Sequence, residues 1–483
     1  MDISLFSDEL VKIGLGLVVV VLFYVWKYIG VNRRIMKAID AGDAAQMRTL
    51  LNKNRDFVNE DMNELLSGYL TYAIIGGQTE CVKGLLELGD GAQLQKKGVE
   101  YEEASMLNLC VEHASAEMLR LLLAAGMKAE VEPESPWMAC CLHGNVEHAR
   151  VLAAAGEDGV TDEQRVAAHG QTPLHAVVYG WFYNPEESAA MVRYLLQEYG
   201  ADVNVCTLAG HTALDLAYDE THVGYERNDE LRRLLTEAGG KRGRSLRVPK
   251  PVYVGRVFVT GSLQALTIDE SLQVKGVSLL RHQEAWSADE LEAALSKYPL
   301  KDSAKQQLLT HSAYVEVRAE GADGEDPVAV AERALSVLRI LETMSGVVGV
   351  QFQSFISSNF KGEGEELCPY NLIGVALGRT DDDDYLLATR GMTDYGLPEV
   401  EIEVPADLYE GKKVSPFEAL GDVLIQIMKG CSAIEPGHTM TLCGKYFSYA
   451  EWERLLCTGE EGLRVVMTED GAPEQFLKPM EKL

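Results

Sequence analysis

Small and hydrophobic residues recur between about residues 35 and 240 in a unit of two helices. Each unit has a small-residue helix, a short turn that often carries glycine, and a second helix that ends in Leu-Leu and glycine. The clearest copies are GQTPLHAVVYG with SAAMVRYLLQEYGADVN (170–180 and 188–204) and GHTALDLAYDE with ELRRLLTEAGG (210–220 and 230–240). More degenerate copies lie at 70–89, 107–126 and 138–156, after an opening half-copy at 36–54. The pattern predicts an all-α solenoid of five to six irregular repeats over residues 35–240.

Beyond residue 251 the pattern changes to short apolar runs that alternate with amphipathic stretches. Strands are predicted at 252–261, 312–321, 347–354, 371–380, 385–392, 400–406 and 463–470. Helices are predicted at 287–298, 326–344 and 416–430. This order indicates an α+β domain over residues 252–483, with a mixed or antiparallel sheet and helices on one face.

The start of the chain carries one long apolar run. Residues 13–26 are uncharged and mostly apolar, and the run extends to Val31 if Lys27 reaches toward the lipid surface. As a helix these residues would span roughly 28 Å, close to the thickness of the hydrocarbon layer. We therefore predict a single transmembrane helix within residues 1–34. A cleavable signal peptide and a buried core helix are the alternatives, and Asp2, Asp8 and Glu9 before the run disfavour the signal peptide.

Basic residues follow this run. Lys27, Arg33, Arg34 and Lys37 lie after it, whereas Lys12 stands nearly alone before it. The positive-inside rule then predicts a single-pass protein of the inner membrane with its C-terminal bulk in the cytoplasm.

Composition narrows the possible partners and compartment. The 483 residues include 74 acidic and 44 basic side chains, a net charge of −30 at pH 7, so general nucleic-acid binding is not expected. The nine cysteines are an odd number with no CxxC pair, which favours buried thiols in a reducing compartment over a disulfide framework or a zinc site.

The repeats resemble ankyrin repeats. The resemblance is specific at Thr172, Pro173, Leu174 and His175, and again at Gly200, Asp202 and Asn204 within Gly-Ala-Asp-Val-Asn. Thr172 can cap the first helix of its repeat, and Pro173 fits the first turn, where no amide donor is needed. The resemblance implies a stack that binds another protein, with a spacer between the C-terminal domain and the membrane as the alternative.

An insertion between two helices of the repeats carries three consecutive aromatic residues, Trp181, Phe182 and Tyr183. Because aromatic side chains are frequent anchors in protein interfaces, we take these three as the candidate partner-binding residues. Local packing of the inserted loop is the alternative.

Residues 241–251, KRGRSLRVPKP, are predicted to be a basic linker between the repeats and the α+β domain. A solvated linker is one reading of this segment. The other is electrostatic contact with anionic lipid or with the acidic remainder of the chain.

The segment TRGMTDYGLPEVEI (389–402) resembles a bacterial family known only as a domain of unknown function, whose pattern contains Thr-x-Gly-Met-x-x-φ-Gly-x-x-Glu. The family has no established activity, so the resemblance transfers no catalytic residue. Its association with ankyrin repeats implies a bacterial component of a toxin, immunity or secretion-linked system.

No familiar catalytic motif is present. The sequence has no GxSxG elbow, and the candidate phosphate loop at 437–446 has the wrong glycine spacing. Cys431, His438 and Cys443 match no known zinc spacing, and the acidic run 381–384 lacks the ligand pattern of an EF-hand. Glu399 and Glu401 point to one face of a strand, as an exposed pair or as an acid–base pair.

These features predict a membrane-anchored protein-interaction module that acts as an immunity or adaptor protein on a toxin or secretion component, with no cofactor or metal. The alternative is a membrane-tethered enzyme whose C-terminal domain is active and whose repeats recruit the substrate. Loss of function on one polar substitution in the C-terminal domain would favour the enzyme.

Overall fold

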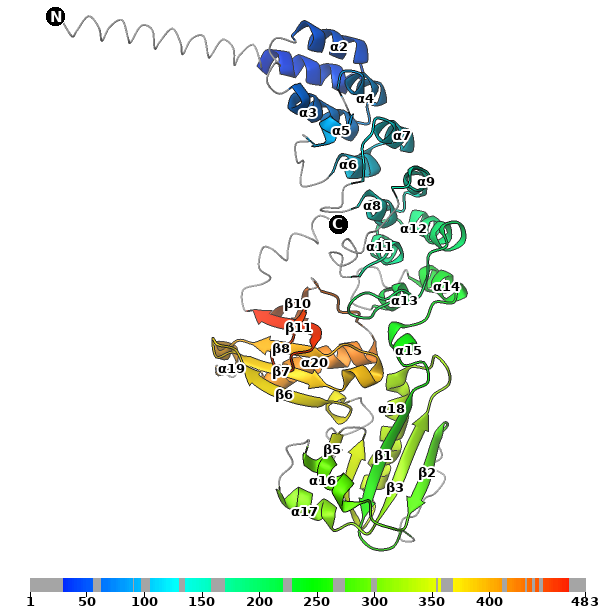
Figure 1. The fold of residues 1–483 in the computed structure, drawn as a ribbon, viewed down its shortest axis with the longest axis vertical. Helices are drawn as coiled ribbons and strands as arrows, with labels where there is room; N and C mark the ends of the chain where they lie inside the picture. The colour runs from blue at the N-terminus through cyan, green and yellow to red at the C-terminus, as the bar shows by residue number, and fades with distance from the viewer. Residues whose placement is uncertain are drawn as a thin grey trace, which may run out of the picture. The chain divides into compact units, whose positions relative to one another are not determined.

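The structure is a computed structural model. It describes residues 29–54, 62–89, 91–96, 105–129, 135–157, 170–219, 228–263, 274–296, 302–352, 355–357, 368–410, 415–430, 432–436, 439–442 and 446–468. The chain divides into two compact units (Figure 1). Unit 1 is Met1–Ala167 with Tyr179–Leu195, and unit 2 is Ala168–Val178 with Leu196–Leu483.

Unit 1 is built from pairs of short helices. The first pair is a helix at 29–40 with α2 (Ala44–Lys53), and the second is α3 (Met62–Ile75) with α4 (Thr79–Leu86). After the short α5 (Gly91–Lys96), the next two pairs are α6 (Met106–His113) with α7 (Ala116–Ala124), and α8 (Pro136–His143) with α9 (Val146–Ala155). First helices contact first helices, α3 to α6 and α6 to α8, and second helices contact second helices, α4 to α7 and α7 to α9. This is the side-by-side packing expected of a repeat stack.

Short polar residues and glycines set the limits of these helices. The side chains of Ser105 and Ser115 accept hydrogen bonds from the backbone N–H groups three residues later, at the starts of α6 and α7. Gly144 and Gly156 end α8 and α9 in the left-handed conformation that favours glycine. Because these signals are local, the sequence alone suffices to locate most of these helices.

The structure corrects the prediction of a transmembrane helix. No helix in the part of the chain that the structure describes is long and apolar enough to cross a bilayer. The described helix at 29–40 carries charged residues, including exposed Arg33, Arg34 and Lys37, and buries Ile35 and Ile39 within unit 1. Residues 13–28 of the predicted span lie outside the described residues. The predicted single-pass inner-membrane location, with its C-terminal bulk in the cytoplasm, depended on that span. The transmembrane helix and this location are therefore both wrong predictions.

The fifth helix pair lies at the boundary between the units. It consists of α11 (Pro173–Gly180) and α12 (Pro185–Arg193), and the π-helical turn η2 (Tyr194–Tyr199) follows. In unit 2 the sixth pair is α13 (Ala213–Ala217) and α14 (Asp229–Glu237). The short helix α15 (Gly243–Arg247) lies within the predicted basic linker.

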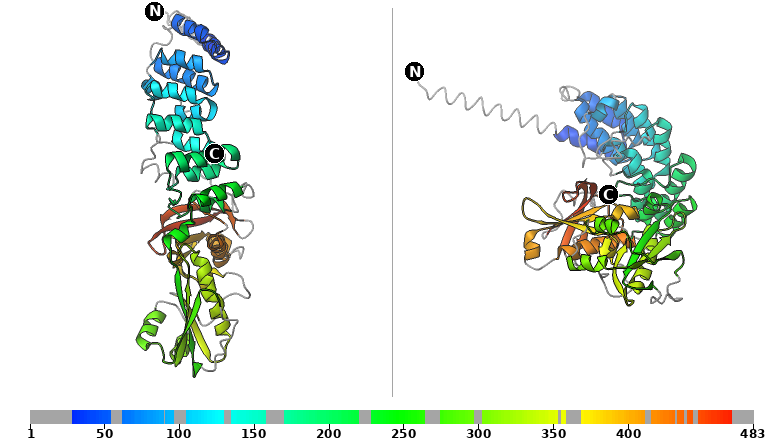
Figure 2. Two further views of the ribbon diagram at one scale, coloured as in Figure 1. Left: turned by 90° about the vertical axis from the view of Figure 1, so that its right-hand side faces the viewer. Right: turned by 60° about the horizontal axis from the view of Figure 1, so that its bottom comes forward.

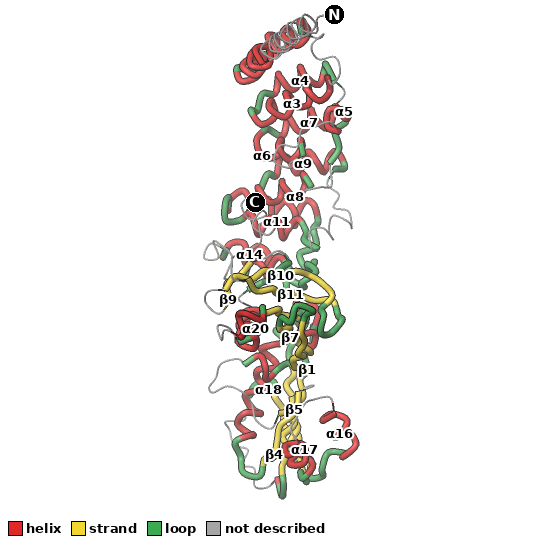
Figure 3. The backbone as a smooth tube through the Cα atoms, turned by 90° about the vertical axis from the view of Figure 1, so that its left-hand side faces the viewer, coloured by secondary structure: helices red, strands yellow, loops and turns green. Residues whose placement is uncertain are grey.

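Strands are found only after residue 251 in the described chain (Figure 3). The first sheet has five strands in the order β2-β3-β1-β4-β5, and all neighbouring pairs are antiparallel. Its strands are β1 (Val252–Val259), β2 (Val277–His282), β3 (Ala313–Glu320), β4 (Val347–Phe352) and β5 (Phe355–Ser357). Helix α18 (Pro327–Glu342) packs along β1, β3 and β4 (Figure 2), while α17 (Asp302–Leu309) contacts β4 and the neighbouring α16 (Ala288–Ser296).

The second sheet has six strands in the order β6-β7-β8-β11-β10-β9. They are β6 (Gly374–Arg379), β7 (Tyr385–Arg390), β8 (Val400–Val404), β9 (Thr439–Leu442), β10 (Tyr446–Arg454) and β11 (Glu461–Thr468). The central pair β8–β11 is parallel and the other pairs are antiparallel. Helix α20 (Pro416–Lys429) packs against β7, β8 and β9 and buries Leu420, Val423 and Leu424.

One hydrophobic core joins the two sheets with α18 and α20. The predicted α+β architecture is therefore confirmed, together with the region of paired helices before it. The sequence did not predict β2, α17 or the β9–β10 pair. The acidic run at 381–384 forms the turn between β6 and β7, where Asp383 adopts a φ of 71°.

Candidate protein-binding surface and the repeat–sheet junction

The Thr-Pro-Leu-His motif forms a local hydrogen-bond network in unit 2. The Nδ1 atom of His175 accepts hydrogen bonds from the Thr172 backbone N–H at 3.1 Å and from the Thr172 hydroxyl at 2.7 Å. Its Nε2 atom donates to the backbone carbonyl of His211 at 3.0 Å. Burial lowers the pKa of His175, so the imidazole is neutral and serves as a link between two successive repeats. Pro173 occupies the first position of α11, and Leu174 is buried behind it.

The Gly-Ala-Asp-Val-Asn segment closes the same repeat. Gly200 has a φ of 79°, and the Asn204 backbone N–H donates to the Asp202 carboxylate at 2.9 Å. The Asn204 side chain donates to the Gly239 carbonyl at 3.2 Å and accepts from the Lys241 N–H at 2.8 Å. Asn204 thus joins its own turn to the turn that ends the next repeat.

The last repeat starts with a capping box in which Asp215 takes the place that His175 has one repeat earlier. Asp215 accepts hydrogen bonds from the Thr212 N–H at 2.8 Å and the Gly243 N–H at 2.7 Å, and it forms an ion pair with Arg242. Burial acts to raise the pKa of Asp215, but the charge of Arg242 and the backbone donors outweigh it and hold the pKa below its usual value. Asp215 therefore ties the last repeat to the start of α15.

A second buried ion pair lies at the same junction. Glu435 accepts hydrogen bonds from the Thr207 hydroxyl at 2.6 Å and from Nδ1 of His211 at 2.7 Å. Burial acts to lower the pKa of His211, but the hydrogen bond and charge of Glu435 outweigh it and raise that pKa. The pair joins the last repeat to the segment between α20 and β9.

Arg244 of α15 completes the junction. Its guanidinium donates to the Met428 carbonyl at 2.8 Å and pairs with Asp326, the N-cap of α18. Gly396 lies against the backbone of Arg244, where an added Cβ would be 2.6 Å from its carbonyl oxygen. The two arginines at the start of the predicted linker are thus held by carboxylates from the last repeat and from α18.

Residues 389–402 build the loop that meets this junction. Glu399 accepts from the Thr389 hydroxyl at 2.5 Å and from the N–H groups of Gly391 and Met392 at 2.8 and 3.0 Å. Tyr395 is buried, stacks on Tyr253 at 5.2 Å, and donates its hydroxyl to the Leu372 carbonyl. The motif residues therefore shape the short 3₁₀ helix at 392–395 that carries Gly396 toward Arg244.

Glu399 and Glu401 are buried, so the expected exposed carboxylate pair is not present. Glu401 accepts from the backbone N–H groups of Leu456 and Cys457 at 3.0 and 2.7 Å. The two carboxylates hold separate loops, which leaves no acid–base pair on the strand.

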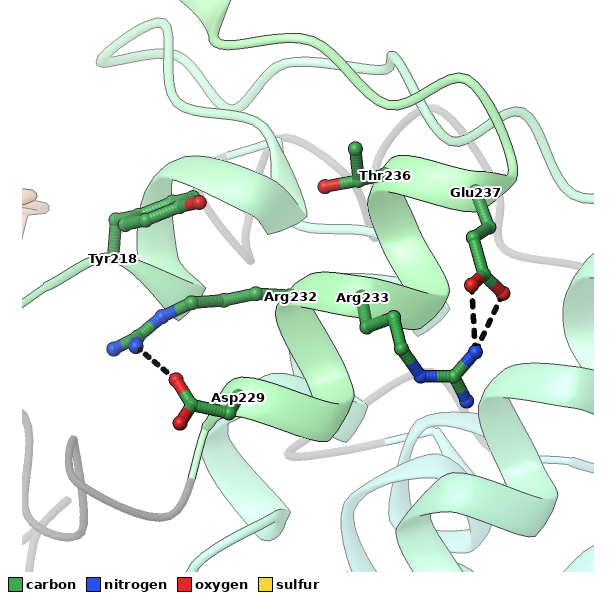
Figure 4. Close-up of a pocket in the computed structure, with 6 residues that line it drawn as sticks. All are labelled: Tyr218, Asp229, Arg232, Arg233, Thr236 and Glu237. Carbon is green, nitrogen blue, oxygen red and sulfur yellow. Dashed lines mark hydrogen bonds and ion pairs between the residues drawn. The ribbon is translucent and has the colours of Figure 1, made fainter.

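The last repeat carries a surface pocket of about 430 Å³ (Figure 4). Its arginines are already neutralised, because Arg232 pairs with Asp229 at 2.9 Å and Arg233 pairs with Glu237 at 2.6 Å. Two guanidinium groups lie over the ring of Tyr218, that of Arg232 at 4.9 Å and that of Arg242 at 5.1 Å from its centroid. Ion-paired polar residues of this kind are typical of the outer face of a terminal repeat.

The three candidate binding residues differ in exposure. In unit 1, Trp181 is buried at 2% exposure, Phe182 is half-buried, and Tyr183 is 62% exposed. Only Phe182 and Tyr183 are therefore accessible to a partner, and their rings meet edge to face at 5.4 Å.

The remaining sequence candidates do not form a site within the described chain. Cys431, His438, Cys443 and residues 437–438 and 443–445 of the candidate phosphate loop lie outside the described residues. Among the residues that the structure does describe, no three His, Cys, Asp or Glu side chains are grouped to hold a metal ion. Sequence reasoning missed His211, Asp215, Arg244 and Glu435, although the spacing of Thr212 and Asp215 is that of a capping box.

Residues 107–207 match the family model for ankyrin repeats in three copies. No curated protein matches the sequence. Similar solved structures include the ankyrin repeat protein EF0377 (18% identity, 42% of this chain and 96% of that chain, TM-score 0.32). A second is the predatory endopeptidase Bd0816 of Bdellovibrio bacteriovorus in complex with the immunity protein Bd3460 (21%, 42% and 97%, TM-score 0.31). A third is the ankyrin repeat domain of Bcl-3 (16%, 41% and 97%, TM-score 0.29). Residues 107–207 of this chain thus carry ankyrin repeats, a fold typical of protein-binding modules.

Proposed function

We propose that this protein is an ankyrin scaffold that binds another protein. The observation that carries the proposal is the set of paired ankyrin helices, which bury their apolar sides against neighbouring pairs and leave charged and aromatic side chains at their surface. Such a stack provides an extended recognition surface rather than an enclosed pocket for a small substrate.

The junction in unit 2 supports a scaffold role for the C-terminal region as well. Asp215, His211 and Arg244 each form a buried or partly buried ion pair, and together these pairs link the last repeat to α15, to α18 and to the segment after α20. These contacts hold the last repeat in one orientation relative to this part of unit 2. Less conformational freedom is therefore lost when a partner binds.

The partner that we propose is a toxin or secretion component, with this protein as its immunity or adaptor protein. This narrower proposal depends on the resemblance of residues 389–402 to a bacterial family.

The test is affinity capture of the full chain from its native host, followed by reconstitution from purified components. An unrelated bait of equal net charge is the control, because a protein of charge −30 collects basic proteins non-specifically. We expect one protein that is absent from the control and that forms a complex of fixed stoichiometry in light scattering. If nothing is enriched over the control bait, the binding function is refuted.

A further inference from the structure

The ends of three successive first helices and the starts of their second helices form one continuous surface in unit 1. Gly180, at the end of α11, lies so close to the Leu142 carbonyl of α8 that no side chain fits between them. Gly144, at the end of α8, has a φ of 71°, and an added Cβ would be 2.7 Å from the Cβ of Glu187 in α12. Within unit 1, the end of α8 is therefore in direct contact with Gly180 and with the first turn of α12.

Glu112 extends this surface to the end of α6. Its carboxylate lies 3.6 Å from Nε2 of His113 and 3.8 Å from Nε2 of His143. The nearby imidazole of His143 is the main cause of a lowered pKa at Glu112, so the carboxylate stays ionised. Three repeats thus contribute to one edge of the helical region.

The aromatic part of this edge is held firmly. Trp181 is buried and anchors the turn, and the Tyr183 N–H donates to the Gly180 carbonyl at 3.1 Å. Phe182 and Tyr183 support each other with an interplanar angle of 74°. The exposed ring of Tyr183 is therefore presented with little freedom to turn away.

Two carboxylates that follow this turn in the chain are not neutralised. Glu186 and Glu187 are exposed in the first turn of α12, where they complement the helix dipole, and neither forms an ion pair with a residue in the described part of the chain. Glu80 in α4 and Glu147 in α9 differ, since Glu80 pairs with Lys83 at 2.7 Å and Glu147 with Arg150 at 2.8 Å.

We propose that Glu112, Phe182, Tyr183, Glu186 and Glu187, here called the acidic–aromatic edge, bind an arginine-containing basic segment of the partner protein. A guanidinium group can stack on a tyrosine ring while its N–H groups bind a carboxylate in two-point geometry, whereas an ammonium group cannot do both equally well. The net charge of −30 would also attract a basic partner. This inference rests on the proposed protein-binding function and identifies the surface and the partner chemistry.

The experiment measures binding of fluorescent nona-arginine and nona-lysine to the full chain by anisotropy at two salt concentrations. The wild type should bind nona-arginine more tightly than nona-lysine. Tyr183→Leu should weaken nona-arginine binding about 2- to 5-fold and remove the preference, which is the range for an exposed cation–π contact. Since Tyr183 is largely exposed, the variant should retain its fold, as circular dichroism would verify.

Charge-matched double variants separate this surface from general electrostatics. Glu186→Gln with Glu187→Gln should weaken nona-arginine binding, while Glu80→Gln with Glu147→Gln removes the same charge from paired positions and should leave binding unchanged. Equal weakening by both pairs, or unchanged binding of Tyr183→Leu, would overturn the proposal.

The captured partner distinguishes this inference from the proposed function. If the stoichiometric partner binds the Tyr183→Leu and Glu186→Gln/Glu187→Gln variants as tightly as wild type, protein binding stands and the acidic–aromatic edge is excluded. If these variants lose the partner, and nona-arginine competes with it for the wild type, both proposals are supported.

Discussion

Replacing Asp215 with asparagine tests the junction between the last repeat and the sheets. Its Oδ2 atom accepts from the Thr212 N–H, the Thr212 hydroxyl and the Gly243 N–H, and its Oδ1 atom pairs with Arg242. An amide has one acceptor oxygen and one donor NH₂ group, so either orientation loses part of this set. The NH₂ group faces the guanidinium in one orientation and the backbone donors in the other.

The expected loss is about 2–4 kcal/mol of unfolding free energy. A hydrogen bond to a charged group contributes about 1.5–3 kcal/mol, and removing one partner of a buried ion pair costs more because the other charge is left unpaired. Arg242 is one-quarter exposed and regains part of its hydration, which keeps the estimate below the upper range for full burial.

The assay is urea unfolding of the full chain, with Asp229→Asn as the matched control in the same repeat. Asp229 is 89% exposed in its pair with Arg232, so its substitution should cost less than about 1 kcal/mol. The pKa of Asp215 is lowered in the folded protein, so its contribution is present above the ordinary aspartate pKa and disappears as pH falls through the folded value. Equal free energies of unfolding for the two variants at pH 7 would refute this role of Asp215. So would a loss of unfolding free energy in Asp215→Asn that is as large at the lowest pH as at pH 7.

Two further predictions concern the same region. Gly396→Ala should lower the melting temperature more than Gly459→Ala, because both glycines have positive φ but only Gly396 lies against Arg244; equal shifts would contradict this. The raised pKa of His211 means that its pair with Glu435 stabilises the fold fully below the ordinary histidine pKa and less as pH rises through the folded value. Unfolding titrations should show this decline for the wild type and lose it in Glu435→Gln, and an unchanged profile in that variant would exclude the pair as its source.

The sequence predicted the ankyrin region because its signals are local. Thr172 to His175 and Gly200 to Asn204 act over a few residues, and the ankyrin family match at residues 107–207 confirms this assignment. The predicted membrane span was wrong: no helix among the described residues is long and apolar enough to cross a bilayer. The described helix at 29–40 instead alternates buried apolar and exposed charged positions.

The C-terminal region was predicted in outline, but not its contacts. The edge strand β2 was missed because its side chains, such as Leu280, are largely exposed and give no clear alternating burial signal. Glu401 was expected on an exposed face because the sequence does not reveal that the turn at 455–457 covers it. His211 and Glu435 are far apart in the sequence, and only the folded chain brings them together.

The parallel pairing of β8 with β11 has a consequence for how this chain is synthesised. Val400 pairs with Leu463, so the centre of the six-stranded sheet is completed only when nearly all the described residues have been made. Until then β8 is an unpaired apolar strand edge, the kind of surface through which nascent chains associate wrongly. Closing the intervening loop also adds long-range contacts that slow folding. The repeat helices contact their neighbours in sequence, so they can form before β11 has been made. A slow translation step before residue 461 would therefore lengthen the time during which one edge of β8 is unpaired.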